Sequence, residues 1–207
     1  MKLSVHNISG KETKRKVDLN DDIFGIEPNN HALYLDVKQY LAAQRSGTHK
    51  SKERSDVKGS RRKLRKQKGS GAARVGDIKN PIFRGGGRVF GPRPRKYGFK
   101  LNKKVKRLAR KSALSYMAKD NNIIVLEDFN FDIPKTNSYT EILSNFNLLD
   151  EKTVLILSEP KNNVFLSSRN LKKARVILAS ELNTYDVMNS NKLMIIESSI
   201  KELENNF

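Results

Sequence analysis

The sequence contains no cysteine and no tryptophan, and only three of its 207 residues are histidine. The lack of cysteine excludes disulfides and cysteine-based zinc or redox sites. The three histidines (His6, His31 and His49) do not pair at the spacing of metal ligands. No run of about 18 apolar residues is present, and the N-terminus lacks the apolar stretch of a signal peptide. We therefore expect a soluble, cytoplasmic protein with no metal and no cofactor.

Acidic residues are almost absent from one long stretch of the chain. Residues 45–100 hold 19 Lys and Arg against three acids, a local charge of +16, together with ten of the twelve glycines. Extending the stretch to residue 111 raises its charge to +22, so the rest of the chain, at −3, is slightly acidic. Since apolar residues here are few and scattered, the stretch cannot bury enough surface to fold alone. We expect a basic arm, inserted in a folded domain and ordered only by a polyanion.

Apolar periodicity on both sides of the arm predicts one folded domain made of residues 1–44 and 101–207. We predict a hairpin that turns at Gly10, then a helix that begins near Pro28 and ends near Gln44. A helix over residues 103–119, with Asn102 as N-cap, carries cations on one face. Its predicted inner face consists of Val105, Leu108, Ala109, Ala113, Tyr116 and Met117.

Four apolar runs follow, and helical patterns separate them. The runs are 123–126, 154–157, 176–178 and 193–196, and the helices are 137–148, 161–171, 183–189 and 198–205. This alternation predicts an α/β fold: a mostly parallel sheet with flanking helices, Rossmann-like in outline. The arm would be a long extended loop inserted after the first long helix.

Signs of an enzyme are weak. The glycines of residues 85–91 lack the Lys-Ser/Thr pair and the following helix of a phosphate-binding loop. Glu127, Asp128 and Asp132 follow a predicted strand, where α/β enzymes place catalytic groups, but no histidine or cysteine lies nearby. We interpret them as a polar loop that caps the sheet, and Asp21-Asp22 as an exposed turn. An RNA-processing or nucleotide-using enzyme stays the alternative.

The composition of the arm favours RNA as the polyanion. Lys and Arg bind phosphates, and glycines permit close backbone approach to RNA and positive φ angles. A flexible arm suits threading through folded RNA, whereas no module for a DNA groove is present. The absence of tryptophan argues against a base-stacking platform as the main mode of binding. Binding should weaken steeply with salt.

Three arm motifs closely resemble the bacterial form of ribosomal large-subunit protein four. They are RSGTHKSKERSDVKGS at residues 45–60, QKGSGAAR at 67–74 and IKNPIFRGGG at 78–87. Shorter matches at 100–104, 109–114 and 165–171 extend the resemblance over essentially the whole chain. It implies a structural, non-enzymatic protein of the large ribosomal subunit that supports early assembly. The globular domain would lie on the outside of the subunit, and the arm would thread through large-subunit rRNA.

The resemblance also implies roles for individual residues. The tip of the arm would line a constriction of the nascent-peptide exit tunnel, facing ribosomal large-subunit protein twenty-two. This tip comprises Arg65, Lys66, Gln67, Lys68, Gly69, Ser70 and Gly71. The tip departs from the family pattern at Arg65-Lys66, where many members have an aromatic residue and an arginine, and at Ala72, where many have arginine.

The cations of the arm and of the helix behind it would bind rRNA. They are Arg45, Lys50, Lys52, Arg54, Lys58, Arg61, Arg62, Lys63, Arg65, Lys66, Lys68, Arg74, Lys79, Arg84, Arg88, Arg93, Arg95, Lys96, Lys100, Lys103, Lys104 and Arg107. The implied partners are large-subunit rRNA, other large-subunit proteins and, transiently, the nascent peptide, with no membrane and no homo-oligomer. A regulatory RNA-binding protein that acts off the ribosome is a further alternative.

Overall fold

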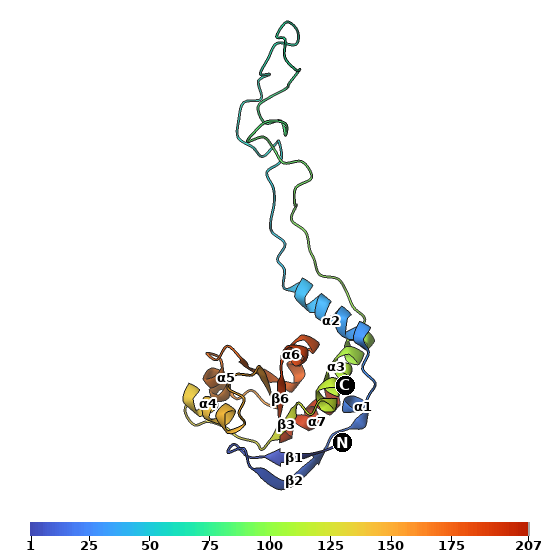
Figure 1. Ribbon diagram of the computed structural model, residues 1–207, viewed down its shortest axis with the longest axis vertical. Helices are drawn as coiled ribbons and strands as arrows, with labels where there is room; N and C mark the ends of the chain where they lie inside the picture. The colour runs from blue at the N-terminus through green and yellow to red at the C-terminus, as the bar shows by residue number, and fades with distance from the viewer. Residues whose placement is uncertain (207) are drawn as a thin grey trace. The chain divides into compact units, whose positions relative to one another are not determined.

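The computed structural model describes residues 1–206, which divide into two units (Figure 1). One unit joins Met1–Leu41 with the chain from Lys100 onward, and we call it the globular domain. The other is Ala42–Phe99, which we call the arm.

The globular domain is built on one six-stranded sheet with the strand order β2-β1-β3-β6-β4-β5. The strands are β1 (Lys2–His6), β2 (Glu12–Asp18), β3 (Ile123–Leu126), β4 (Thr153–Leu157), β5 (Ala174–Leu178) and β6 (Lys192–Ile196). β1 and β2 pair antiparallel, and all other neighbours are parallel. The helices are α1 (Asp21–Phe24), α2 (Asn30–Ala43), α3 (Lys103–Lys119), α4 (Thr136–Asn145), α5 (Asn162–Ser168), α6 (Thr184–Asn189) and α7 (Glu197–Asn206), with a 3-10 turn η1 (Ala179–Glu181). The predicted α/β class, with a mostly parallel sheet and flanking helices, is confirmed.

Hydrophobic cores cover both faces of the sheet. In β6, Leu193 and Ile195 belong to the core shared with α1, α3 and α7, whereas Met194 and Ile196 belong to the core shared with α4 and α5. Side chains of a strand alternate between faces, so a strand covered on both sides needs an apolar residue at every position. This is why β3, β4 and β6 are continuous apolar runs in the sequence.

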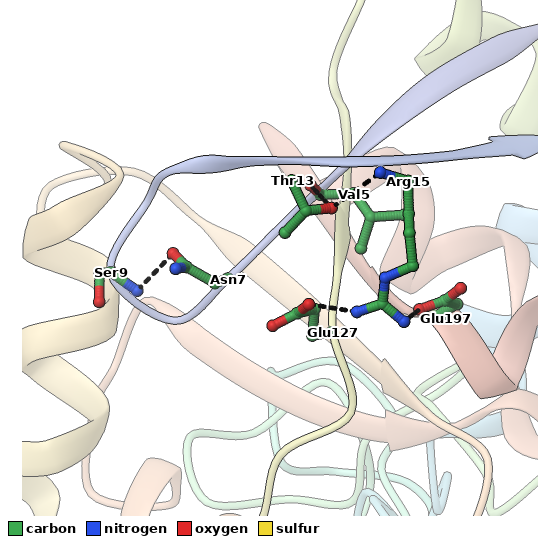
Figure 2. Close-up of polar contacts among 7 residues, drawn as sticks. All are labelled: Val5, Asn7, Ser9, Thr13, Arg15, Glu127 and Glu197. Atoms are coloured by element: carbon green, nitrogen blue, oxygen red, sulfur yellow. Dashed lines mark hydrogen bonds and ion pairs between the residues drawn. The ribbon is translucent and has the colours of Figure 1, made fainter.

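The N-terminal hairpin forms as predicted, and its own side chains hydrogen-bond its backbone. Gly10 lies in its turn with φ 77°. The side chain of Asn7 accepts hydrogen bonds from the backbone N–H of Ser9 at 3.1 Å (Figure 2) and from that of Lys11 at 3.0 Å. Thr13 Oγ1 donates to the carbonyl of Val5 at 2.8 Å. β2 is an edge strand of sequence ETKRKVD, and such charged edges discourage pairing with another chain.

Several element ends differ from the prediction because side chains decide them. α2 begins at Asn30 rather than Pro28, since Asn29 Oδ1 accepts a hydrogen bond from the N–H of Ala32 at 2.9 Å and so caps the helix. α4 ends at Asn145 because Asn147 adopts φ 56°, and the N–H of Leu148 then closes onto the carbonyl of Leu143 at 2.8 Å.

The end of α5 and the conformation of Asp21-Asp22 also differ from the prediction. α5 ends at Ser168, three residues earlier than predicted. Asp21 and Asp22 are exposed, as expected, but they form the first turn of α1 rather than a simple turn.

The inner face of α3 also differs from the predicted one. Leu108 is exposed and Val105 half-buried, whereas Leu114, Ser112 and Ser115 are buried. Ser112 Oγ donates to the carbonyl of Leu108 at 2.7 Å, and Ser115 Oγ donates to the carbonyl of Ile26 at 2.5 Å. Because both hydroxyls find backbone partners, Ser112 and Ser115 can be buried in this face. Periodicity predicted the apolar Leu108 for the face and did not predict the two serines. Asn102 precedes the helix as predicted, but its side chain makes no capping hydrogen bond.

Candidate nucleic-acid interface

The arm is a pair of irregular limbs joined by backbone hydrogen bonds. Residues 44–102, all described in the structure, contain no helix or strand. The limbs leave α2 and return to α3 alongside each other (Figure 1). The cross-limb bonds run from Arg95 N to Gly47 O (3.1 Å), Ser51 N to Pro92 O (2.9 Å), Arg88 N to Lys52 O (2.9 Å) and Leu64 N to Gly76 O (3.0 Å).

Glycines let the two limbs approach closely. Gly47 has φ 63°, and a Cβ atom there would collide with the carbonyl oxygen of Arg95. A Cβ on Gly87 would collide with the backbone of Arg54. The sequence predicted close approach to RNA, but at these two positions the arm's own opposite limb occupies the space. Gly69 and Gly71 also have positive φ angles, yet no atom lies within 4 Å of a Cβ built on either.

The cations predicted to bind rRNA are almost all exposed. The exception among the 22 is Lys79, which is 7% exposed, so its side chain contributes to packing inside the arm. Three cations form ion pairs with the three acids of the arm. The pairs are Lys50–Asp56 (3.0 Å), Arg54–Asp77 (3.1 Å) and Arg93–Glu53 (2.6 Å). The hydrogen bond from Lys50 holds the pKa of Asp56 below its ordinary value. The positive excess of the arm therefore stays open to a polyanion.

Tyr97 holds the two limbs together near their base, and sequence reasoning missed it. The guanidinium of Arg45 lies 3.8 Å from the ring centroid and that of Arg95 lies 4.6 Å from it. The hydroxyl of Tyr97 is 2.9 Å from Nε2 of His49. Two predicted phosphate-binding cations thus also make cation–π contacts within the protein. The available signal was that Tyr97 is the single tyrosine among residues 45–100.

The predicted tip has no packing of its own. Every residue from 61 to 72 is exposed, and the only side-chain hydrogen bond described within the tip and its neighbours 63–71 is donated by Lys63 to Gln67. The cations Arg65, Lys66 and Lys68 are therefore free of acidic partners in the described chain. On α3, the predicted cations Lys103, Lys104 and Arg107 are exposed as well.

The acids at the carboxyl edge of the sheet are occupied by internal contacts. Arg15 of β2 reaches over the edge and forms ion pairs with Glu127, just after β3, and with Glu197, at the start of α7 (3.0 Å to Glu197) (Figure 2). Asp128 accepts a hydrogen bond from Ser198 at 2.5 Å. Sequence reasoning missed Arg15 because it lies more than 100 positions from Glu127.

Residues 1–206 contain neither a metal-ligand cluster nor a helix that could span a membrane. No group of three or more His, Asp or Glu side chains is arranged to hold a metal ion there. In the same residues, no helix is both long enough and apolar enough to cross a membrane.

Comparisons with known proteins cover the whole chain. Residues 17–206 match the model of the family described as Ribosomal protein L4/L1 family. The chain is 63% identical over 207 residues to large ribosomal subunit protein uL4 of Parabacteroides distasonis, covering 100% of this chain and 99% of that protein. It is 59% identical over 207 residues to the protein of the same name from Amoebophilus asiaticus (100% and 99% covered). For that of Christiangramia forsetii, the identity is 58% over 204 residues (99% and 98% covered). The chain therefore belongs to the ribosomal protein L4/L1 family.

Proposed function

We propose that this chain is a structural, non-enzymatic protein of the large ribosomal subunit and that its arm binds large-subunit rRNA. Its relatives are named large ribosomal subunit protein uL4. The observation that carries the proposal is the arm itself, where every predicted rRNA-binding cation except Lys79 is exposed and only three are ion-paired. Such a surface suits a dense array of phosphates, and α3 of the globular domain carries exposed cations of its own.

The finer placement is also part of the proposal. The tip, residues 65–71, lines the constriction of the nascent-peptide exit tunnel and faces ribosomal large-subunit protein twenty-two. Full exposure of the tip supports this, because a segment without internal packing takes its shape from its surroundings. The protein joins the subunit early in assembly and resides in the cytoplasm as part of it.

Sedimentation of a cell lysate in magnesium buffer tests membership of the subunit. We expect this chain, detected by immunoblot on a sucrose gradient, to migrate with large subunits and to remain there after a high-salt wash. Many simultaneous phosphate contacts inside folded rRNA make such binding resistant to washing. Migration near the top of the gradient would instead favour a free regulatory RNA-binding protein or an enzyme.

Site-specific photo-crosslinking tests the placement of the tip. A photoreactive residue at Gln67 should form adducts with a stalled nascent peptide or with large-subunit protein twenty-two. The same residue at Lys201, on α7 of the globular domain, serves as the matched control and should not form these adducts. Adducts at Gln67 with rRNA alone would contradict tunnel placement while leaving rRNA binding intact.

A further inference from the structure

A three-residue bulge interrupts the pairing of the two limbs. Arg88 and Pro92 are tied by backbone hydrogen bonds, both of 2.9 Å, to Lys52 and Ser51, which are adjacent in the sequence. Two neighbouring residues on one limb therefore hold both ends of a five-residue stretch on the other. The three residues between those ends, Val89, Phe90 and Gly91, have no place in the pairing and stand outside it.

Phe90 sits at the apex of this bulge in an unfavourable backbone conformation. Its φ is 54°, and the other two described non-glycine residues with positive φ, Asn121 and Asn147, belong to a type that tolerates the left-handed region. A bulky residue in this region is strained, and such strain persists only where the surrounding structure enforces it. Here the anchored ends of the bulge enforce it.

The ring of Phe90 is held away from the rest of the arm. The side chain is fully exposed, more so than any other large apolar side chain described. The inner side of the bulge is filled, because a Cβ on Gly91 would collide with Ser51 and come within 3.0 Å of the Arg88 side chain. The ring makes no aromatic or cation–π contact within residues 1–206.

The surroundings of the ring identify the chemistry of its ligand. Arg88 precedes Phe90 by two residues and its N–H bonds the carbonyl of Lys52 across the limbs; both cations are exposed, and neither has an acidic partner in the described chain. Exposed cations at the base of a bulge and an exposed aromatic ring at its apex suit a nucleotide, with phosphate on the cations and the base on the ring. An apolar pocket on another protein would need no such cations, and the arm as a whole favours a polyanion.

We propose that Phe90 stacks on an unpaired nucleobase of the large-subunit rRNA, with Arg88 and Lys52 holding the adjoining phosphates. This inference rests on the proposed function and adds a base-recognition point to an arm otherwise assigned to phosphates. The lack of tryptophan argues against an extended stacking platform, and a single pre-positioned phenylalanine is compatible with that observation.

The first test measures the affinity of the full-length chain for transcribed large-subunit rRNA over a series of salt concentrations. Stacking on a base typically contributes enough that Phe90→Leu should weaken binding about tenfold at every salt concentration. The slope of log K against log salt should not change, because no charge is removed. Phe90→Tyr, which keeps the aromatic face, should bind like the wild type. Ile82→Ala, an exposed apolar residue of the same arm, is the matched control and should have little effect.

The second test uses the absence of tryptophan from the chain. Phe90→Trp introduces a single fluorophore at the apex of the bulge. Its emission should be quenched when the variant binds the same rRNA, since stacking on a base quenches indole fluorescence, and its affinity should stay close to wild type.

Different failures have different meanings. Wild-type affinity for Phe90→Leu, an equal loss for Ile82→Ala, or unquenched emission in the rRNA complex would overturn stacking and leave rRNA binding intact. Normal binding of Phe90→Leu to naked rRNA combined with its loss from assembled subunits would place the ring in an apolar pocket of a protein. If the wild type shows no salt-dependent rRNA binding, the proposed function fails and this inference fails with it.

Discussion

At the residue scale, Arg15 is the side chain that holds the carboxyl edge of the sheet together. It reaches from β2 to Glu127 and Glu197, whose side chains are 34% and 29% exposed. Without it, two carboxylates at the ends of neighbouring strands would face each other with no counter-charge.

Replacing Arg15 tests this structural role. Arg15→Ala should lower the free energy of unfolding by about 1 kcal/mol, as expected for partly exposed ion pairs. The loss should shrink at high salt, which screens both the attraction and the remaining repulsion. Urea denaturation at two ionic strengths measures it. Lys16→Ala, on the same strand but without an ion pair in the described residues, is the control, and an equal effect for both variants would contradict the assigned role.

A second residue-scale prediction concerns Tyr139 of α4. Its side chain is buried and its hydroxyl has no hydrogen-bond partner within residues 1–206. Tyr139→Phe should therefore raise the free energy of unfolding by about 1 kcal/mol, because an unsatisfied buried hydroxyl carries a desolvation cost. Tyr116→Phe is the matched comparison: its hydroxyl donates to Asn30 at 2.6 Å, so stability should fall instead. A loss of stability in both variants would show that Tyr139 has a partner.

Burial also makes the stability of the chain depend on alkaline pH through Tyr139. Desolvation raises the pKa of this phenol well above its ordinary value of about 10. Above that ordinary value the unfolded chain loses the proton while the folded chain keeps it. The free energy of unfolding is thus unaffected by this titration below a pH of about 10 and falls as the pH rises further. Urea midpoints measured across this range should decline less steeply for Tyr139→Phe than for the wild type.

At the element scale, the base of the arm depends on one glycine. Gly47 adopts φ 63° and leaves no room for a Cβ beside the carbonyl of Arg95. Gly47→Ala should separate the limbs and expose the amide of Arg95, whose hydrogen bond to Gly47 is 3.1 Å long. Hydrogen exchange should show faster exchange of that amide. Gly98→Ala, where a Cβ meets nothing within 4 Å, should leave the exchange rate unchanged.

The outer part of the arm contributes no core to the globular domain. Deleting residues 63–74 should leave the free energy of unfolding of the globular domain within about 0.5 kcal/mol of wild type, because surface changes away from packing have small effects. The buried residues of that domain lie outside this segment, whose residues are exposed. Urea denaturation measures this directly, and an unfolded deletion protein would place the arm in the core. Under the proposed placement of the tip, the deletion should alter the exit tunnel more than it alters stability.

At the scale of the whole molecule, the charge is segregated rather than spread. The chain carries +19, while residues 45–111 alone carry +22. A molecule of this kind approaches a polyanion with one part and has little electrostatic reason to bind it with the rest. Binding strength should therefore follow the cations of the arm and not the total charge.

Two pairs of charge-removing substitutions test whether the cations of the arm or the total charge govern rRNA binding. Replacing Lys58 and Arg62 by Gln should reduce the salt slope of rRNA binding by roughly one to two, since each phosphate contact contributes nearly one. Replacing Lys135 and Lys201, exposed cations of the globular domain, removes the same charge and should leave the slope unchanged. Equal reductions of the salt slope for the two pairs of variants, measured from rRNA affinities, would mean that total charge governs binding.

The sequence by itself determined the class of the fold and the position of the exposed basic arm, because both depend on local composition. Apolar runs such as 123–126 and 193–196 predict strands covered on both faces wherever they pack, and a run of cations stays at the surface unless it is paired. The ends of helices were harder to predict from the sequence, because Asn29 and Asn147 act through hydrogen bonds and φ angles that apolar periodicity does not reveal.

Only the tertiary structure decided which distant residues meet. Arg15 contacts Glu197 across 182 positions, and Tyr97 contacts His49 across 48. The bulge that presents Phe90 exists because backbone bonds of the opposite limb fix both of its ends. Such contacts depend on the path of the chain in space, and a linear pattern of residue types carries no information about pairs that the fold alone brings together.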